Sequence, residues 1–145
     1  NLVAYNPKKG FDVLSPIIKN HPEIEWVRLE NMSAGEMANT LKKCKVYVDF
    51  GNHPGKDRIP REAAMSGCCV ITNCEGAAGN EYDIPINSKY KIENPTESEN
   101  YVIILINNIF EDFLSYYNDF DEYRNMIKDE EEKFIRDLQS IFGNL

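Results

Sequence analysis

The sequence predicts an α/β fold: a Rossmann-like parallel sheet flanked by helices, with two helices at the C-terminal end. Two observations predict it. Short apolar segments recur along the first 100 residues, and segments with helical periodicity separate them. Most of the apolar segments also lack polar alternation, which is typical of parallel strands covered on both faces. We expect one domain over residues 1–145, with the α/β core in 1–100 and the C-terminal helices in 101–145.

The first elements are a strand, a helix and a second strand. Residues 2–5 are apolar, and the segment 6–10, with its proline and glycine, ends that strand. Apolar residues at three- and four-residue steps begin at Phe11 and predict a helix that stops before His21-Pro22. Residues 24–29 alternate apolar and polar positions and carry aromatic and β-branched side chains, so they predict the second strand.

A second helix and a third strand follow, and then a third helix. Ser33 with Glu36 three positions later matches a capping box and predicts a helix start. Residues 46–50 predict the third strand. A polar loop leads to Pro60, which we expect to begin a helix that stops at Gly67.

The rest of the chain predicts one more strong strand and then helices. Residues 68–72 are fully apolar, and a small-residue loop at 76–79 follows them. A weak strand near 89–92 completes the predicted sheet. Helical periodicity covers 101–117 and 122–142, with a break at 118–121.

Charge and composition exclude some classes of function. The net charge is −8, which argues against nucleic-acid binding, because that affinity comes mainly from a basic surface. The acidity is concentrated in residues 111–145, so the first three-quarters of the chain can still hold an anion site. The four cysteines and two histidines lack the spacing of metal ligands, and we expect reduced, buried thiols and no metal.

No apolar run is long enough to span a bilayer. Together with the reduced cysteines, this leads us to expect a cytoplasmic protein. Contact with the membrane face through other parts of the protein is compatible with that expectation.

Three loops at one edge of the predicted sheet carry the candidate site, because ligands of open parallel sheets bind outside the carboxyl ends of the strands. The loops cover residues 6–10, 51–61 and 75–79. They combine lysines and arginines at helix starts with small residues that let backbone N–H groups approach a ligand. This combination predicts a phosphate-bearing ligand. The candidate contacts are Lys8, Lys9, Gly10, Arg58, Arg61, Glu62, Gly76, Ala77 and Ala78.

Residues 60–73 (PREAAMSGCCVITN) resemble the P-x-E-A-M-x-x-G-x-P-V-I signature of GT-B glycosyltransferases, closest to the family-4-like retaining enzymes. Residues 6–10 resemble the lysine-glycine loop of that family. Residues 32–41 resemble the helix that precedes its third strand, and residues 76–78 resemble its glycine-rich turn. The resemblance covers residues 1 to about 92.

The resemblance implies the C-terminal, donor-binding domain of a metal-independent glycosyltransferase. Such a domain binds a nucleoside-diphosphate sugar, with no separate cofactor, for transfer to a glycan or lipid-linked acceptor. By the resemblance, Glu62 would bind the ribose and Lys9 the diphosphate, and Gly10 would permit close backbone approach. Leu29, Glu30 and Met32 would lie near the nucleobase. The acceptor-binding N-terminal domain would be a partner outside this chain, so the chain alone would bind the donor without catalysis.

Two departures from the family pattern concern the sugar side of the site. Pro54 stands where the family often has a second glutamate, and the arginine that usually accompanies the first-loop lysine is absent. An alternative is therefore a catalytically inactive module of the same fold that binds a nucleotide or a protein. A receiver domain, suggested by Asp49 after the third strand, would need an acidic pair after the first strand, where the chain has Asn6, Lys8 and Lys9.

Overall fold

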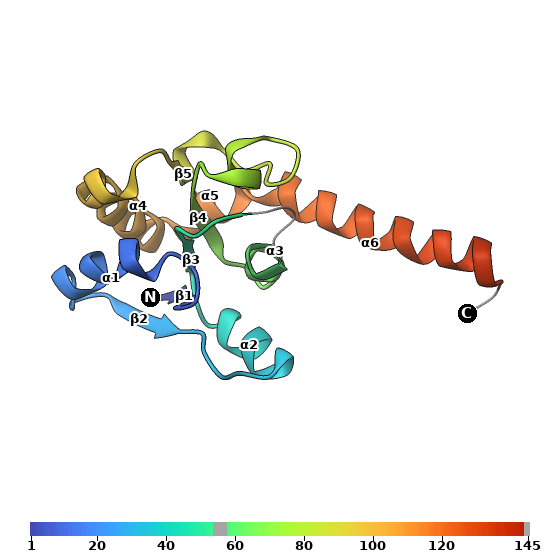
Figure 1. Cartoon of the computed structure of the whole chain (residues 1–145), viewed down its shortest axis with the longest axis horizontal. Helices are drawn as coiled ribbons and strands as arrows, with labels where there is room; N and C mark the ends of the chain where they lie inside the picture. The colour runs from blue at the N-terminus through green and yellow to red at the C-terminus, as the bar shows by residue number, and fades with distance from the viewer. Residues whose placement is uncertain (54–57, 144–145) are drawn as a thin grey trace.

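A five-stranded parallel sheet forms the centre of the computed structural model, which describes residues 1–53 and 58–143 (Figure 1). The strand order is β2-β1-β3-β4-β5, and every neighbouring pair is parallel. This confirms the predicted α/β class with a Rossmann-like sheet. The strands are β1 (Leu2–Tyr5), β2 (Glu25–Arg28), β3 (Val46–Asp49), β4 (Cys69–Asn73) and β5 (Lys91–Ile92).

Helices cover both faces of the sheet. Figure 1 shows α1 and α4 on one side and α2 and α3 on the other. This arrangement follows from the strand order and the right-handed crossover rule, because the chain moves from β1 to β2 in one direction and returns from β2 to β3 in the other. The helices are α1 (Phe11–Asn20), α2 (Ala34–Leu41), α3 (Arg58–Met65), α4 (Glu99–Glu111), α5 (Phe113–Asn118) and α6 (Asp121–Phe142), with short 3-10 turns at 76–79, 88–90 and 95–97.

The middle strands are buried along their whole length. Every residue of β3 and β4 is buried, whereas the edge strand β2 has exposed residues at both ends. The continuous apolar segments predicted for a sheet covered on both faces are thus the central strands. Burial of these side chains is the main source of stability in the α/β core.

The start of α2 follows the predicted capping box. The Ser33 hydroxyl accepts a hydrogen bond from the backbone N–H of Glu36 at 3.2 Å. Leu41 at the end of this helix is fully buried, and Cys44 just beyond it is also buried. Leu41, together with the partly buried Met37, therefore packs this helix against the hydrophobic core.

Two predicted boundaries were wrong. The helix expected over 101–117 is divided at Asp112, whose backbone (φ −134°, ψ 57°) lies outside the helical region. The bend lets Phe113 lie under the Lys45 ammonium and Tyr116 pack edge-on against Tyr90, and these tertiary contacts outweigh the continuous helical periodicity. Helix α3 already includes Arg58, so Pro60 is its third described residue rather than its first.

The final helix, α6, is anchored at one end only. Tyr123, Arg124 and Ile127 in its first two turns are buried, while residues 131–142 are almost entirely exposed. Figure 1 shows this second half extending away from the body of the molecule. The break predicted at 118–121 is confirmed, since α5 ends at Asn118 and α6 begins at Asp121. Within the described residues, no helix is both long and apolar enough to cross a membrane.

Candidate functional site

The loops after β1 and β3 are in direct backbone contact. Gly10 has a positive φ of 62°, and a Cβ atom there would lie 2.2 Å from the carbonyl oxygen of Phe50 and 2.7 Å from the backbone nitrogen of Gly51. A Cβ on Gly51 would in turn lie 2.7 Å from the Cβ of Lys9. Glycine at position 10 is therefore required both by conformation and by space.

The loop after β4 closes on the loop after β3 in the same way. Gly76 has a φ of 57°, and a Cβ there would lie 2.1 Å from the carbonyl oxygen of His53. The same carbonyl accepts a hydrogen bond from the backbone N–H of Ala77 at 2.7 Å. The three loops predicted to share one edge of the sheet thus meet there, with the loop after β3 in the middle.

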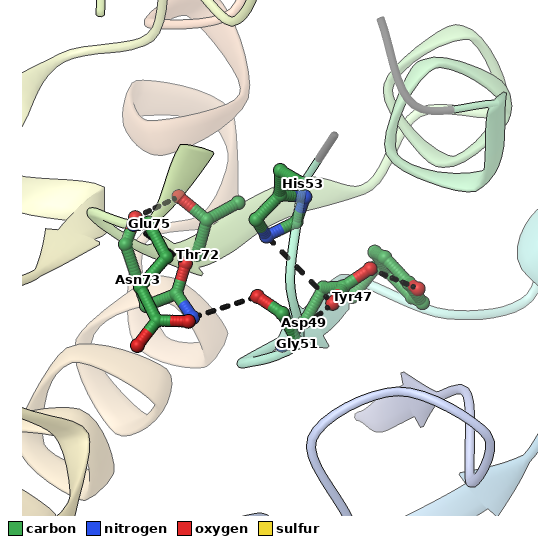
Figure 2. Close-up of polar contacts among 7 residues, drawn as sticks. All are labelled: Tyr47, Asp49, Gly51, His53, Thr72, Asn73 and Glu75. Carbon is green, nitrogen blue, oxygen red and sulfur yellow. Dashed lines mark hydrogen bonds and ion pairs between the residues drawn. The ribbon is translucent and has the colours of Figure 1, made fainter. Parts of the chain in front are cut away.

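A buried carboxylate organises the middle loop (Figure 2). Asp49, the last residue of β3, is 1% exposed. Its Oδ2 accepts a hydrogen bond from the Tyr47 hydroxyl at 2.9 Å, and its Oδ1 accepts one from the backbone N–H of Gly51 at 3.0 Å. His53 Nε2 lies 3.8 Å from Asp49 Oδ1, and the His53 side chain is also fully buried. These hydrogen bonds offset the cost of burying the polar Asp49 side chain.

Asn73 joins the middle loop to the loop after β4. Its side-chain amide donates to the carbonyl of Gly51 at 2.8 Å, and its side-chain oxygen accepts from the backbone N–H of Glu75 at 3.2 Å. The sequence analysis does not predict that Asp49 and Asn73 hold the loops. A pattern that could have indicated it is present, because each is a polar residue at the end of an otherwise apolar buried strand.

The first loop presents lysines beside an open helix start. The Asn6 side chain accepts a hydrogen bond from the backbone N–H of Lys8 at 3.0 Å, and the Asn6 carbonyl accepts one from Lys9 at 3.1 Å. The Lys8 side chain is exposed, and Lys9 is half-buried. The N-cap residue of α1 is Gly10, which has no side chain to cap the helix. The positive end of the α1 dipole favours an anion at this position.

The charged side chains of α3 lie in a different environment. Arg58 Nε contacts Glu62 Oε1 at 3.0 Å, and an Arg61 guanidinium nitrogen (NH2) contacts Glu130 Oε2 of α6 at 2.7 Å. Arg58, Arg61 and Glu62 line a cavity of about 220 Å³ that is completed by Met65 of α3 and by Ile127 and Glu131 of α6. The partners of these three residues are thus on α3 and α6, rather than on the loops that carry Lys8, Gly10 and Gly76.

The residues expected near a nucleobase follow the end of β2. The Leu29 side chain is buried, and its backbone N–H donates to the carbonyl of Tyr5 at 2.9 Å. Arg28 Nε donates a hydrogen bond to Glu30 Oε2 at 2.6 Å, and this bond raises the pKa of Arg28 above its ordinary value. Met32 Sδ lies 3.8 Å from the Thr40 hydroxyl. Of the three expected residues, Leu29 belongs to the core, and Glu30 presents a polar group at the surface.

Ala77 and Ala78 are buried, while Gly76 is exposed at the start of its turn. Ala77 and Ala78 are therefore part of the core under the loop, and only their backbone groups can contact a ligand. Pro54, which stands in place of the second family glutamate, and Lys56 lie outside the described residues.

The cysteines show no reactive or metal-binding arrangement in the described parts of the chain. Burial raises the pKa of Cys69 to about 12 and raises that of Cys68 further, so both remain thiols at neutral pH. The Cys68 thiol donates to the backbone carbonyls of Leu41 and Cys44. Among residues 1–53 and 58–143, no group of three or more His, Cys, Asp or Glu side chains is arranged to hold a metal ion.

A cavity of about 580 Å³ lies between the loop 81–87 and the junction of α5 and α6. Its lining includes the carboxylates of Glu81, Asp119 and Glu122. These like charges disfavour a phosphate-bearing ligand there. On electrostatic grounds, the loop edge with Lys8 and Lys9 is the better anion site of the two.

No protein-family model matches this chain, and no match was found among the curated proteins. The geometry of the loops and the resemblance in the sequence are therefore the basis for assigning a function.

Proposed function

We propose that the chain is the donor-binding domain of a GT-B glycosyltransferase and that it binds a nucleoside-diphosphate sugar at the carboxyl edge of its sheet. The observation that carries the proposal is the contact of Gly10 with Phe50 and Gly51. This contact brings the start of α1, whose N-cap residue is Gly10, and the first-loop lysines to the point between β1 and β3 where the strand order reverses. Ligands of open α/β sheets bind at that point.

In this proposal the diphosphate lies against the backbone N–H groups at the start of α1, with Lys8 and Lys9 beside it. These groups are fixed before the ligand arrives, because the glycine contacts and the Asp49 and Asn73 hydrogen bonds hold the loops. A preorganised set of donors stabilises the negative charge that develops on a leaving diphosphate. The acceptor and the residues that activate it would belong to another domain.

The ion pairs of Arg58, Arg61 and Glu62 favour fewer ligand contacts from α3 than the family resemblance implies. An arginine held by Glu130 must give up that contact before it can bind a phosphate. We accordingly assign the primary anion contacts to the backbone N–H groups at the start of α1, with the exposed Lys8 beside them, and keep Glu62 as a ribose contact that requires release from Arg58.

Titration with inorganic pyrophosphate, UDP and GDP, followed by NMR amide shifts, tests the proposal. The largest shifts are expected at Gly10, Phe11 and Asp12. Lys9→Ala should weaken binding of all three ligands about tenfold. Lys43→Ala, an exposed lysine after α2, is the matched control and should leave binding unchanged. Absence of shifts near Gly10 at millimolar ligand would reject the proposal.

A second measurement separates the two roles open to Glu62. Glu62→Ala should weaken binding of UDP or GDP more than binding of pyrophosphate if the carboxylate holds the ribose. Equal effects on both would limit Glu62 to its ion pair with Arg58. Transfer or donor hydrolysis by the protein that also contains the acceptor-binding domain distinguishes an enzyme from the inactive binding module.

A further inference from the structure

A groove runs along the inner half of α6, away from the three loops of the candidate anion site. The cavity of about 580 Å³ beside the loop 81–87 and a second cavity of about 450 Å³ both include Glu122 in their linings, so the two cavities adjoin. The second cavity follows α6 as far as Lys133. This part of the helix is about 16 Å long, at 1.5 Å per residue. We call the two cavities together the α6 groove.

Three carboxylates of the α6 groove have no partner among the described residues. Glu81 lines the first cavity, Asp129 lines the second, and Glu122 lines both. All three side chains are exposed. Over residues 1–53 and 58–143, no hydrogen bond or ion pair joins any of these carboxylates to another side chain. Their charges are therefore available to a partner without the loss of an internal contact.

The two other acidic residues of the lining already have partners. Lys89 Nζ lies 2.8 Å from Asp119 Oδ2, and an Arg61 guanidinium nitrogen lies 2.7 Å from Glu130 Oε2. In the part of the chain that the structure describes, no three His, Cys, Asp or Glu side chains are grouped to hold a metal ion. The α6 groove therefore suits a partner with several separated positive charges rather than a single metal ion.

The unpaired carboxylates of α6 alternate with an apolar contact surface. Glu122 and Asp129 are seven positions apart, so they lie on the same face of the helix, about 10 Å apart along its axis. Met126 lies between them on that face and is half-buried. Methionine adapts its shape to different apolar partners. Pro85 adds apolar lining on the loop side, and Tyr82 of the same loop is 86% exposed.

A basic amphipathic helix matches this arrangement. Lys or Arg side chains two turns apart would lie opposite Glu122 and Asp129, and an apolar side chain between them would contact Met126. The charge of the surrounding segment favours the same partner, because residues 111–145 carry ten acidic and four basic residues. A cationic segment is attracted to such a surface, whereas nucleic acids and anionic lipid surfaces are repelled.

We propose that the α6 groove is a docking surface for a basic amphipathic helix of a partner protein. Glu122 and Asp129 bind the positive charges of that helix, and Met126 contacts its apolar side chain. No residue of the groove lining belongs to the three loops of the candidate anion site. The docking surface is thus an additional function and does not depend on nucleotide binding.

Fluorescence anisotropy with a labelled peptide tests the proposal. The probe is a stapled helix of about four turns, with Lys at two positions seven residues apart and Leu between them on the same face. Glu122→Gln combined with Asp129→Asn should weaken its binding about tenfold. Glu132→Gln combined with Asp137→Asn removes the same charge from exposed positions of α6 outside the groove lining, and should weaken binding less than about twofold.

Two further probes test the apolar contact and the size of the partner. A peptide with Ser in place of Leu should bind about tenfold more weakly than the Leu peptide. Spermine should not displace the Leu peptide at equal concentration. An equally tight Ser peptide, or equal losses in the two double variants, would reduce the groove to general acidity and overturn the proposal. Displacement by spermine would overturn it in favour of a polyamine site.

Amide chemical shifts of the unaltered protein provide a measurement that does not depend on the folding of a variant. The Leu peptide should shift signals of residues 81–87 and 119–133 and leave Gly10 unchanged. Shifts confined to other parts of the chain, or no binding at millimolar peptide, would overturn the docking surface. Neither result would affect the proposed nucleotide site, which pyrophosphate titration tests separately.

Discussion

The loop edge of the sheet is tightly packed, whereas the outer half of α6 is largely exposed. At the loop edge, glycines at positions 10 and 76 have no room for one additional carbon, and buried polar side chains hold the loops. In the outer half of α6, large apolar side chains such as Phe134 (63% exposed) point into solvent. The same loop contacts therefore stabilise the fold and position the groups proposed to bind the ligand. The outer half of α6 contributes little to either. Four substitutions test that difference between the two regions.

The largest effect is expected at Gly10. Gly10→Ala places a Cβ 2.2 Å from a backbone oxygen and requires a left-handed backbone, so it should lower the free energy of unfolding by about 3 kcal/mol or more. Urea denaturation followed by circular dichroism measures this. In the matched control Gly35→Ala, a Cβ within α2 would meet nothing within 4 Å, and stability should rise by about 0.5–1 kcal/mol. Similar values for the two would refute close packing of the loops.

A smaller loss is expected when the link between two loops is removed. Asn73→Ala deletes the hydrogen bonds to Gly51 and Glu75 and leaves the carbonyl of the buried Gly51 without that partner. We expect a loss of about 2 kcal/mol in the same denaturation experiment. Asn107→Ala, at an exposed position of α4, should not destabilise the chain. If Asn73→Ala were equally harmless, the loops would be held by the glycine contacts alone.

Alkaline pH should weaken the packing between the sheet and α5. Burial raises the pKa of Tyr90 well above 10.0, and the hydrogen bond of its hydroxyl to Asp119 at 2.6 Å adds to this. The protonated form is thus favoured in the folded state, and its contribution to stability is complete below pH 10 and lost as pH rises above it. Tyr90→Phe should cost about 1 kcal/mol at pH 7. The variant should also lose stability less steeply above pH 10; an equal slope would contradict the assignment.

The smallest effect is expected on the outer helix. Phe134→Ala should change the free energy of unfolding by less than about 0.5 kcal/mol, because the side chain is already exposed. Phe120→Ala is the matched comparison at a fully buried position before α6, and it should cost about 3–5 kcal/mol. A large loss at Phe134 would show that the outer half of α6 packs against something in solution.

The fold could be predicted because the chain has strong local signals. The strands predicted at 46–50 and 68–72 form as β3 and β4 and are buried along their whole length, and the Ser33 cap forms as its sequence pattern indicates. The division at Asp112 could not be predicted in the same way. Helical periodicity continues across it, and the bend depends on contacts of Phe113 and Tyr116 with residues far away in the sequence.

The sequence could predict which loops form the candidate site, but it could not predict the partners of their charged side chains. Strand order at one edge of a parallel sheet brings the three loops together, and Gly10 and Gly76 lie in their contacts. The partners of Arg61 and Glu62 depended on where α6 packs, which no local pattern encodes.

The position of β1 between β2 and β3 has a consequence for the time course of folding. Val3 pairs on one side with Trp26 and on the other with Val46, so its second partner is synthesised much later than the strand itself. At roughly 5–20 residues per second, β1 waits on the order of several seconds for β3. During that interval its apolar side chains have no complete sheet to join. Pairings between such distant segments also slow refolding, so β1 is the segment most in need of protection while the chain is being made.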